Sequence, residues 1–144
     1  MISGYFNIAS AGALAAELLA EACRLGPEDD LRLGTVRELA ADLGRRLSSL
    51  VETPAGGTSD SLVEAALACA DLATLAVCNV PDLPEDGKAL GAAATQLAAG
   101  TTHALLALVG EGVPQDAHAE NVSRDARSAG WKADLALHQI AKTI

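Results

Sequence analysis

The stretch SLVEAALACADLATLAVCN, at residues 61–79, is apolar on nearly every side when it is wound into a helix. A second stretch, ALGAAATQLAAGTTHALLALVG at residues 89–110, carries no Asp, Glu, Lys or Arg. A helix that is hydrophobic all round lies in the interior of a protein, so both stretches are expected at the centre of the fold. Their alanines and glycines let helix backbones come close together, and we expect the two helices to pack tightly against each other.

Apolar residues recur at helical spacing in the rest of the chain, and no stretch alternates in the way that a half-buried strand requires. We expect a first helix over residues 10–25 with Leu14 and Leu25 on its buried face, and a second that begins at Pro27 with Leu39 in its core stripe. A last helix runs to the C-terminus, with a separate apolar seam at Trp131 and Leu135. The sequence therefore predicts an all-α, compact bundle of about five helices, with residues 1–144 as a single domain.

Charge and targeting signals narrow the classes of function. The chain has 144 residues and a net charge of −9, and such an acidic surface repels phosphate backbones, so no nucleic-acid partner is expected. The N-terminal apolar stretch has no Lys or Arg before it and is interrupted by Glu17 and Glu21, which is not typical of a signal peptide. We expect a cytoplasmic protein without a membrane span, in which the apolar run at 89–110 is a core helix.

Two apolar helices are difficult to cover with only three others in so short a chain. The surplus apolar surface favours a homodimer that buries it between two copies. Cys69 and Cys78 stand nine positions apart, on opposite sides of one helix, and both are expected to be small buried hydrophobic residues.

Polar residues on the two central helices are the candidates for chemistry, because burial of a polar group requires a partner. Glu64, Asp71 and Cys78 recur every seven residues, with Thr74 close to the same line. One interpretation is a cleft in which burial raises the pKa values of the two carboxylates for general acid or base catalysis. The alternative is a stripe that faces solvent or pairs with a basic neighbour such as Arg45 or Arg46.

The helix at residues 89–110 offers His103 as a proton carrier if it faces a cavity, or else as a core histidine bonded to a backbone carbonyl. Gln96 and Thr102 lie near it in the helix and, with Thr74, are candidate substrate-binding residues. We predict His103, Asp71 and Glu64 as the catalytic residues. No Glu-x-x-His or His-Glu-x-x-His motif occurs, so neither a metal nor another cofactor is expected.

The residues Pro81-Asp-Leu-Pro-Glu-Asp86-Gly87, the alanine-rich helix reaching Ala99-Gly100 and the long final helix resemble, in that order, the cyclodeaminase/cyclohydrolase family of folate enzymes. The resemblance implies a small all-helical dimer and, from the family's Ser-Asp-Ala-Gly turn, places Asp86 at the substrate site. The sequence departs from the family at residues 8–12, where a Pro-Gly-Gly-Gly-Ser loop has no match. It departs again at residues 101–103, where Thr-Thr-His stands in place of an expected asparagine.

Two functions follow as hypotheses. The first is a metal-free helical-bundle enzyme that uses acid/base chemistry for cyclisation, elimination or deamination of a small organic molecule. The second is a non-catalytic helical homo-oligomer that acts as a binding or scaffolding protein. A ligand-binding regulator is a third alternative, but the sequence shows no basic DNA-reading helix.

Overall fold

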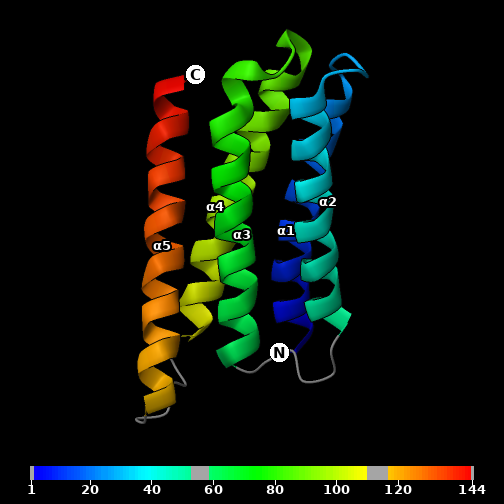
Figure 1. Ribbon diagram of the computed structural model, residues 1–144. Helices are drawn as coiled ribbons and strands as arrows, with labels where there is room; N and C mark the ends of the chain where they lie inside the picture. Colours follow the sequence, from blue (N-terminus) through cyan, green and yellow to red (C-terminus); the bar gives the residue numbers. More distant parts are fainter. Residues whose placement is uncertain (1, 53–58, 110–116, 144) are drawn as a thin grey trace.

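A computed structural model describes residues 2–52, 59–109 and 117–143, and the regular structure of these residues is entirely helical (Figure 1). This confirms the predicted all-α bundle of about five helices. The elements are α1 (Ile2–Arg24), α2 (Leu31–Glu52), α3 (Ser59–Asn79), the 3-10 turn η1 (Val80–Asp82), α4 (Glu85–Val109) and α5 (Ala117–Thr143).

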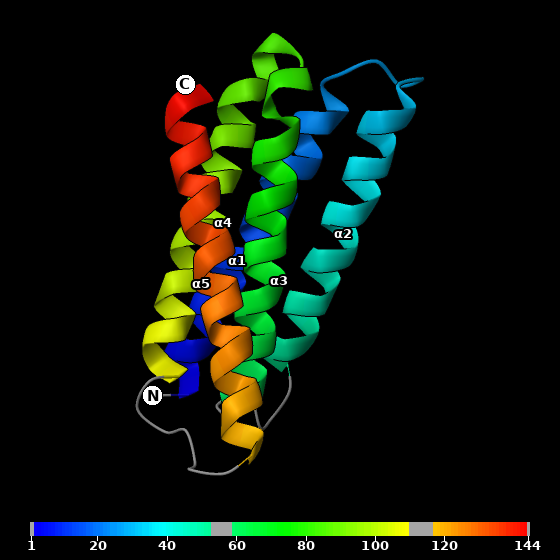
Figure 2. The same cartoon turned by 60° about the vertical axis from the view of Figure 1, so that its left-hand side comes forward.

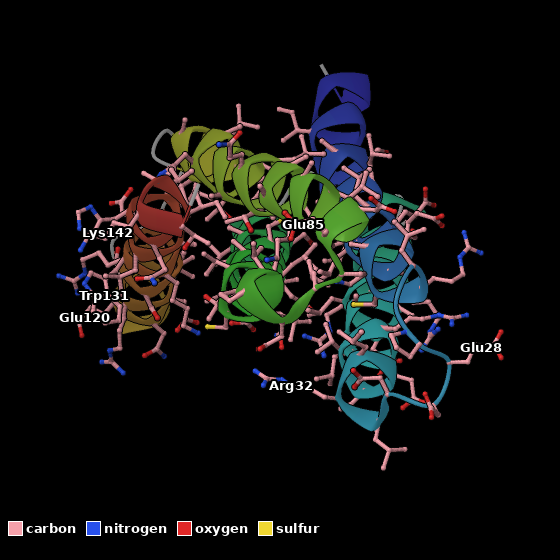
Figure 3. The ribbon with its side chains drawn as sticks, turned by 90° about the horizontal axis from the view of Figure 1, so that it is seen from above. Glu28, Arg32, Glu85, Glu120, Trp131 and Lys142 are labelled. Atoms are coloured by element: carbon pink, nitrogen blue, oxygen red, sulfur yellow. The ribbon has the colours of Figure 1, made fainter. Side chains whose placement is uncertain are left out.

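Successive helices run in opposite directions, and the two apolar helices lie in the middle of the bundle (Figures 1 and 2). Helix α4 packs against α1, α3 and α5, while α3 packs against α2, α4 and α5. Seen from above, α5 stands on one side of this pair and α1 and α2 stand on the other (Figure 3). The prediction of two central apolar helices is therefore confirmed.

Helices α3 and α4 are also long and apolar enough, by length and composition, to cross a membrane. Within each helical range, an 18-residue window passes this test. The buried share of that window is 61% in Ser61–Asp82 and 50% in Glu85–Val109. Half or more of each window is thus already packed against other parts of the chain.

The core is built mainly from small side chains. Alanine is the commonest buried residue among the described positions, and the largest fully buried hydrophobic side chains are those of Leu19, Leu47, Leu72, Leu105 and Ile140. Protein interiors are close-packed, so with so few bulky residues the space must be filled by bringing the helices close together.

Two glycines mark places where this close approach leaves no room for a side chain. A Cβ atom added at Gly12 of α1 would lie 2.6 Å from the Cys69 Sγ atom of α3. One added at Gly87 of α4 would lie 2.8 Å from the backbone carbonyl oxygen of Ala22 on α1. The contact at Gly87 is the more severe, because a backbone atom cannot move aside as a flexible side chain can.

The connection between α1 and α2 differs from the prediction. Helix α2 begins at Leu31 rather than at Pro27, because Asp30 caps it: the Asp30 Oδ1 atom accepts a hydrogen bond from the Leu33 backbone N–H at 3.1 Å. Pro27 lies in the preceding turn, where its carbonyl oxygen accepts a bond from the Asp30 N–H. At the other end of the chain, α1 begins at Ile2 instead of Ser10, since residues 2–9 contain no proline to break the helix.

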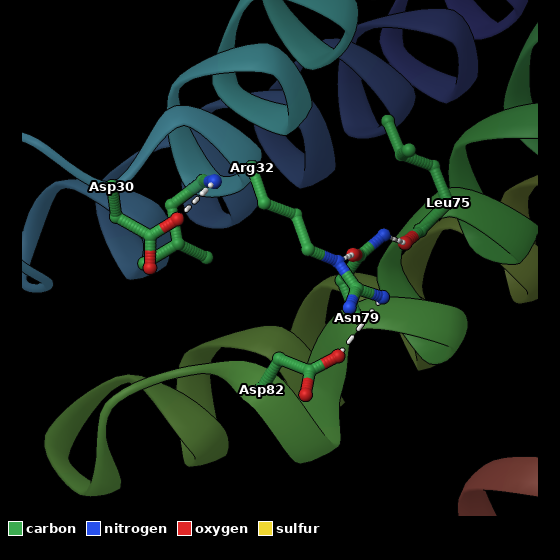
Figure 4. Close-up of polar contacts among 6 residues, drawn as sticks. Asp30, Arg32, Leu75, Asn79 and Asp82 are labelled. Carbon is green, nitrogen blue, oxygen red and sulfur yellow. Dashed lines mark hydrogen bonds and ion pairs between the residues drawn. The ribbon is translucent and has the colours of Figure 1, made fainter.

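A polar cluster fastens the start of α2 to the end of α3 (Figure 4). The Arg32 Nε atom donates to Asn79 Oδ1 at 3.3 Å, and its Nη2 atom lies 2.9 Å from Asp82 Oδ2 in η1. The Nδ2 group of the buried Asn79 donates to the Leu75 carbonyl oxygen at 2.7 Å. Each polar atom of the Asn79 amide thus has a partner, as burial requires.

Three leucines that were expected on buried faces are half exposed, and this expectation was wrong. Leu14 of α1, Leu25 in the turn directly after α1 and Leu39 of α2 keep 47–50% of their surface accessible. The physical reason is that α1 and α2 lie at the edge of the bundle, so their apolar stripes are wider than the surface their neighbours cover.

We expect Gly87→Ala to lower the free energy of unfolding by about 1–3 kcal/mol, because the new methyl group would push α4 away from the α1 backbone. The matched control is Gly34→Ala in α2, where an added Cβ meets nothing within 4 Å. Alanine is the better helix former, so the control should gain up to about 1 kcal/mol. Chemical denaturation followed by circular dichroism measures both, and equal stabilities would contradict the close approach of α1 and α4.

Candidate functional site

Helix α3 lies between α2 and α5 and packs against both (Figure 1), and its predicted polar stripe is on the side that they leave largely open. Glu64, Thr74 and Cys78 are exposed, and Asp71 is half buried. The Thr74 hydroxyl donates to the Ala70 carbonyl oxygen of its own helix at 3.0 Å. Of the two interpretations, the structure therefore favours a stripe that faces solvent or pairs with a basic neighbour over an enclosed cleft: α3 buries its other sides against the surrounding helices, and its polar residues occupy the side that remains open.

Asp71 has a basic partner, but on a helix that was not anticipated. The Lys132 Nζ atom of α5 lies 3.0 Å from Asp71 Oδ1, with the two side chains 37% and 46% exposed respectively. Arg45, one of the expected partners, pairs instead with Asp42 on α2. A partly exposed ion pair of this kind contributes up to about 1 kcal/mol, and here it links α3 to α5.

His103 also pairs with α5. Its Nε2 atom lies 2.8 Å from Asp134 Oδ1, and the imidazole is 41% exposed. A carboxylate bonded to a histidine can orient the ring. The arrangement is thus competent for proton transfer in chemical terms, although it lies in partial contact with solvent rather than in an enclosed cavity.

The two pairs lie on different sides of α5. Lys132 and Asp134 are two positions apart, and residues two apart on a helix project about 160° away from each other. Asp71 and His103 are therefore held by opposite flanks of α5, with the helix between them. The structure does not bring the predicted catalytic residues into one site.

The remaining predicted site residues are dispersed as well. Asp86 is exposed in the first turn of α4, and Gln96 is exposed further along the same helix. Thr102 is fully buried, and its hydroxyl donates to the Ala98 carbonyl oxygen at 2.9 Å. That bond uses the Thr102 donor within the helix, which leaves it no open path to a substrate.

Three hollows in the surface of the described residues are open rather than enclosed. One of about 390 Å³ lies between α1 and α4, where Gln96, Gly100 and Ala104 face Ile8 and Ala11. Two more lie between α1 and α2, with volumes of about 540 and 350 Å³. Of the predicted site residues only Gln96 lines any of these three, and Glu64, Asp71 and His103 line none of them.

No pattern in the sequence identifies Lys132 and Asp134 as the partners of Asp71 and His103. Both lie among alternating charges on α5, a pattern typical of a solvated helix, and only the packing of α5 against α3 and α4 selects them. Among the described residues, no group of three or more His, Cys, Asp or Glu side chains is placed to hold a metal ion.

Comparison with known proteins adds no identification. No family model, no curated protein and no solved structure matches this chain. The resemblance to the cyclodeaminase/cyclohydrolase family stays a prediction, as does the role at Asp86 that it implies.

The three cysteines differ in solvent exposure, and a thiol reagent can distinguish them. Cys23 and Cys69 are buried, and burial raises the pKa of both thiols, that of Cys69 to about 12. Cys78 is exposed, so the expectation of a buried residue was wrong there. Its position nine residues from Cys69 places it on the opposite, open side of α3.

In the folded protein we expect a thiol reagent such as Ellman's reagent to modify Cys78 within minutes, because the thiolate is the reactive form and must be accessible. Cys23 and Cys69 should react only when the chain unfolds. The absorbance of the released thiolate, measured with and without denaturant, separates the two classes. Cys78→Ser should abolish the fast reaction, and a fast reaction that survives in this variant would contradict the burial of Cys23 and Cys69.

Proposed function

We propose that this protein is a helical homodimer that acts as a binding or scaffolding protein rather than as an enzyme, and that its two copies meet along α1 and α4. The proposal rests above all on the uncharged surface that these two helices share. We also propose that the protein is cytoplasmic, because a reducing environment keeps an exposed thiol such as that of Cys78 free.

The surface shared by α1 and α4 is free of formal charge over most of its length. Residues 8–16 of α1 and 89–109 of α4 contain no Asp, Glu, Lys or Arg. Along the exposed side of α4 the residues are small or neutral, namely Ala89, Ala93, Gln96, Gly100, Ala104 and Ala107. In a chain of net charge −9, this surface lets two copies approach without opposing carboxylates.

Gly100 supports the same surface. It lies within α4 and is exposed, and an added Cβ atom would meet nothing within 4 Å. Glycine inside a helix costs up to about 1 kcal/mol relative to alanine, and no contact with the side chains that the structure describes accounts for that cost here. A helix of a second copy, packed closely against α4 at this point, would account for it, since small residues permit close approach of helices.

The acid/base hypothesis has one feature in its favour, the hydrogen-bonded pair of His103 and Asp134. General acid/base catalysis requires its groups within hydrogen-bond reach of one substrate. Asp71 lies on the other flank of α5, and Glu64 and Asp86 are exposed on other parts of the surface. The geometry therefore favours the dimer over the enzyme.

Sedimentation velocity tests the dimer directly. We expect the wild-type protein to sediment with twice the chain mass of 14.6 kDa. Gly100→Glu should raise the dissociation constant at least about tenfold, a change of about 1.4 kcal/mol, because it places a carboxylate from each copy in the interface.

The matched control is Gly34→Glu, which adds the same charge at another exposed helical glycine with open space around it. It should leave the dissociation constant within about twofold of the wild type. A wild-type chain that remains monomeric at every concentration tested would contradict the proposal. Equal weakening by the two variants would show that net charge, and not this surface, controls association.

A further inference from the structure

The outward side of α5 carries a row of exposed residues that no part of the bundle covers. They are spaced by three or four positions and therefore share one face of the helix. We call the part of this row from Arg124 onward the outer stripe of α5, and its members are Arg124, Arg127, Trp131, Leu135, His138 and Lys142. The exposed Glu120 lies one turn before the stripe on the same face. Figure 3 shows Trp131 and Lys142 projecting from α5 away from the other helices. The stripe spans 19 residues, with about 27 Å along the helix between its ends.

The outer stripe combines free cations with exposed apolar surface. Trp131 is 65% exposed and Leu135 is 47% exposed, one helical turn apart. Arg124, Arg127 and Lys142 take part in none of the ion pairs found among the described residues, whereas Lys132 and Asp134 on the flanks of α5 are paired with α3 and α4. The charges that α5 needs for its own packing are therefore separate from those of the outer stripe.

This combination specifies the chemistry of an occupant. Tryptophan and arginine are enriched among the residues that contribute most to protein–protein binding, especially where they become buried. Apolar side chains on the occupant would cover Trp131 and Leu135, and carboxylates on either side of them would meet the two arginines and Lys142. A helix with a narrow apolar row flanked by Glu or Asp carries both features at matching intervals.

We propose that the outer stripe of α5 binds an acidic amphipathic helix of another protein. An anionic membrane fits less well, because a charged bilayer extends beyond the stripe and would repel the rest of a chain whose net charge is −9. A short acidic helix meets only the stripe itself, and charges further away than about 10 Å are largely screened at physiological ionic strength.

This inference deepens the proposed binding function by naming the chemistry of the partner. It does not depend on the same surface, since the outer stripe belongs to α5 and the proposed dimer contact belongs to α1 and α4. A peptide titration measures binding to the stripe whether the protein is a monomer or a dimer. Sedimentation tests the dimer independently, so the failure of one proposal can be distinguished from the failure of the other.

Trp131 is the only tryptophan in the chain, and its fluorescence therefore reports directly on the stripe. The probe is a synthetic 18-residue helical peptide with leucines at alternating three- and four-residue spacing, flanked by glutamates. We expect its addition to shift the Trp131 emission to shorter wavelength in a saturable manner, with affinity that falls as salt is added. A peptide with glutamine in place of each glutamate should bind at least about tenfold more weakly.

The decisive comparison uses two double variants. Arg124→Glu with Arg127→Glu should weaken binding of the acidic peptide at least about tenfold. Arg37→Glu with Arg46→Glu, which makes the same change of charge at exposed positions of α2, should leave it within about twofold. Leu135→Asp should also weaken binding while it keeps the fluorescent reporter.

Several outcomes would overturn the proposal. They are the absence of an emission shift with the acidic peptide, equal weakening by the two double variants, or an equal shift with phosphatidylserine vesicles. A shift that follows protein concentration alone, without peptide, would instead assign the stripe to contact between copies of this chain.

Discussion

The close approach of alanine-rich helices is the constraint on which the structure depends. The buried sides of helices α3 and α4 consist mainly of small side chains, and the glycines at positions 12 and 87 leave no room for even a methyl group. In such a core, stability comes from many short contacts between helices rather than from a few large side chains. The same use of small residues continues on the outside of α4, where Gly100 is exposed and an added Cβ atom would meet nothing within 4 Å among the described residues.

Much of the fold was predictable because helical periodicity and composition are local signals. The apolar stretches at residues 61–79 and 89–110 indicated the central helices directly. Local signals failed where packing decides: Leu14 and Leu39 match a buried stripe, but the edge helices have too few neighbours to cover them. At Pro27 two start signals compete, and the side chain of Asp30, which caps the helix at Leu31, prevails over the proline.

The candidate site was less predictable, for a related reason. A spacing of seven correctly places Glu64 and Asp71 on one side of α3, but it does not tell whether that side faces a neighbour or solvent. The answer depends on how α5 packs. On one flank of α5, Lys132 pairs with Asp71, and on the other flank Asp134 pairs with His103. Helix α5 thus uses its inner charges to fix its own position. Its outer charges and Trp131 remain available for a partner, and the uncharged surface of α1 and α4 remains available for a second copy.

Native-state hydrogen exchange, resolved by residue, tests the central role of α3 and α4 most directly. If alanine packing between these two helices holds the bundle together, amides in the middle of both should exchange only through global unfolding. Amides of α2, at the edge of the bundle, should exchange through smaller openings that leave α3 and α4 paired. Exchange in α3 or α4 at a lower free energy than in α2 would contradict the account.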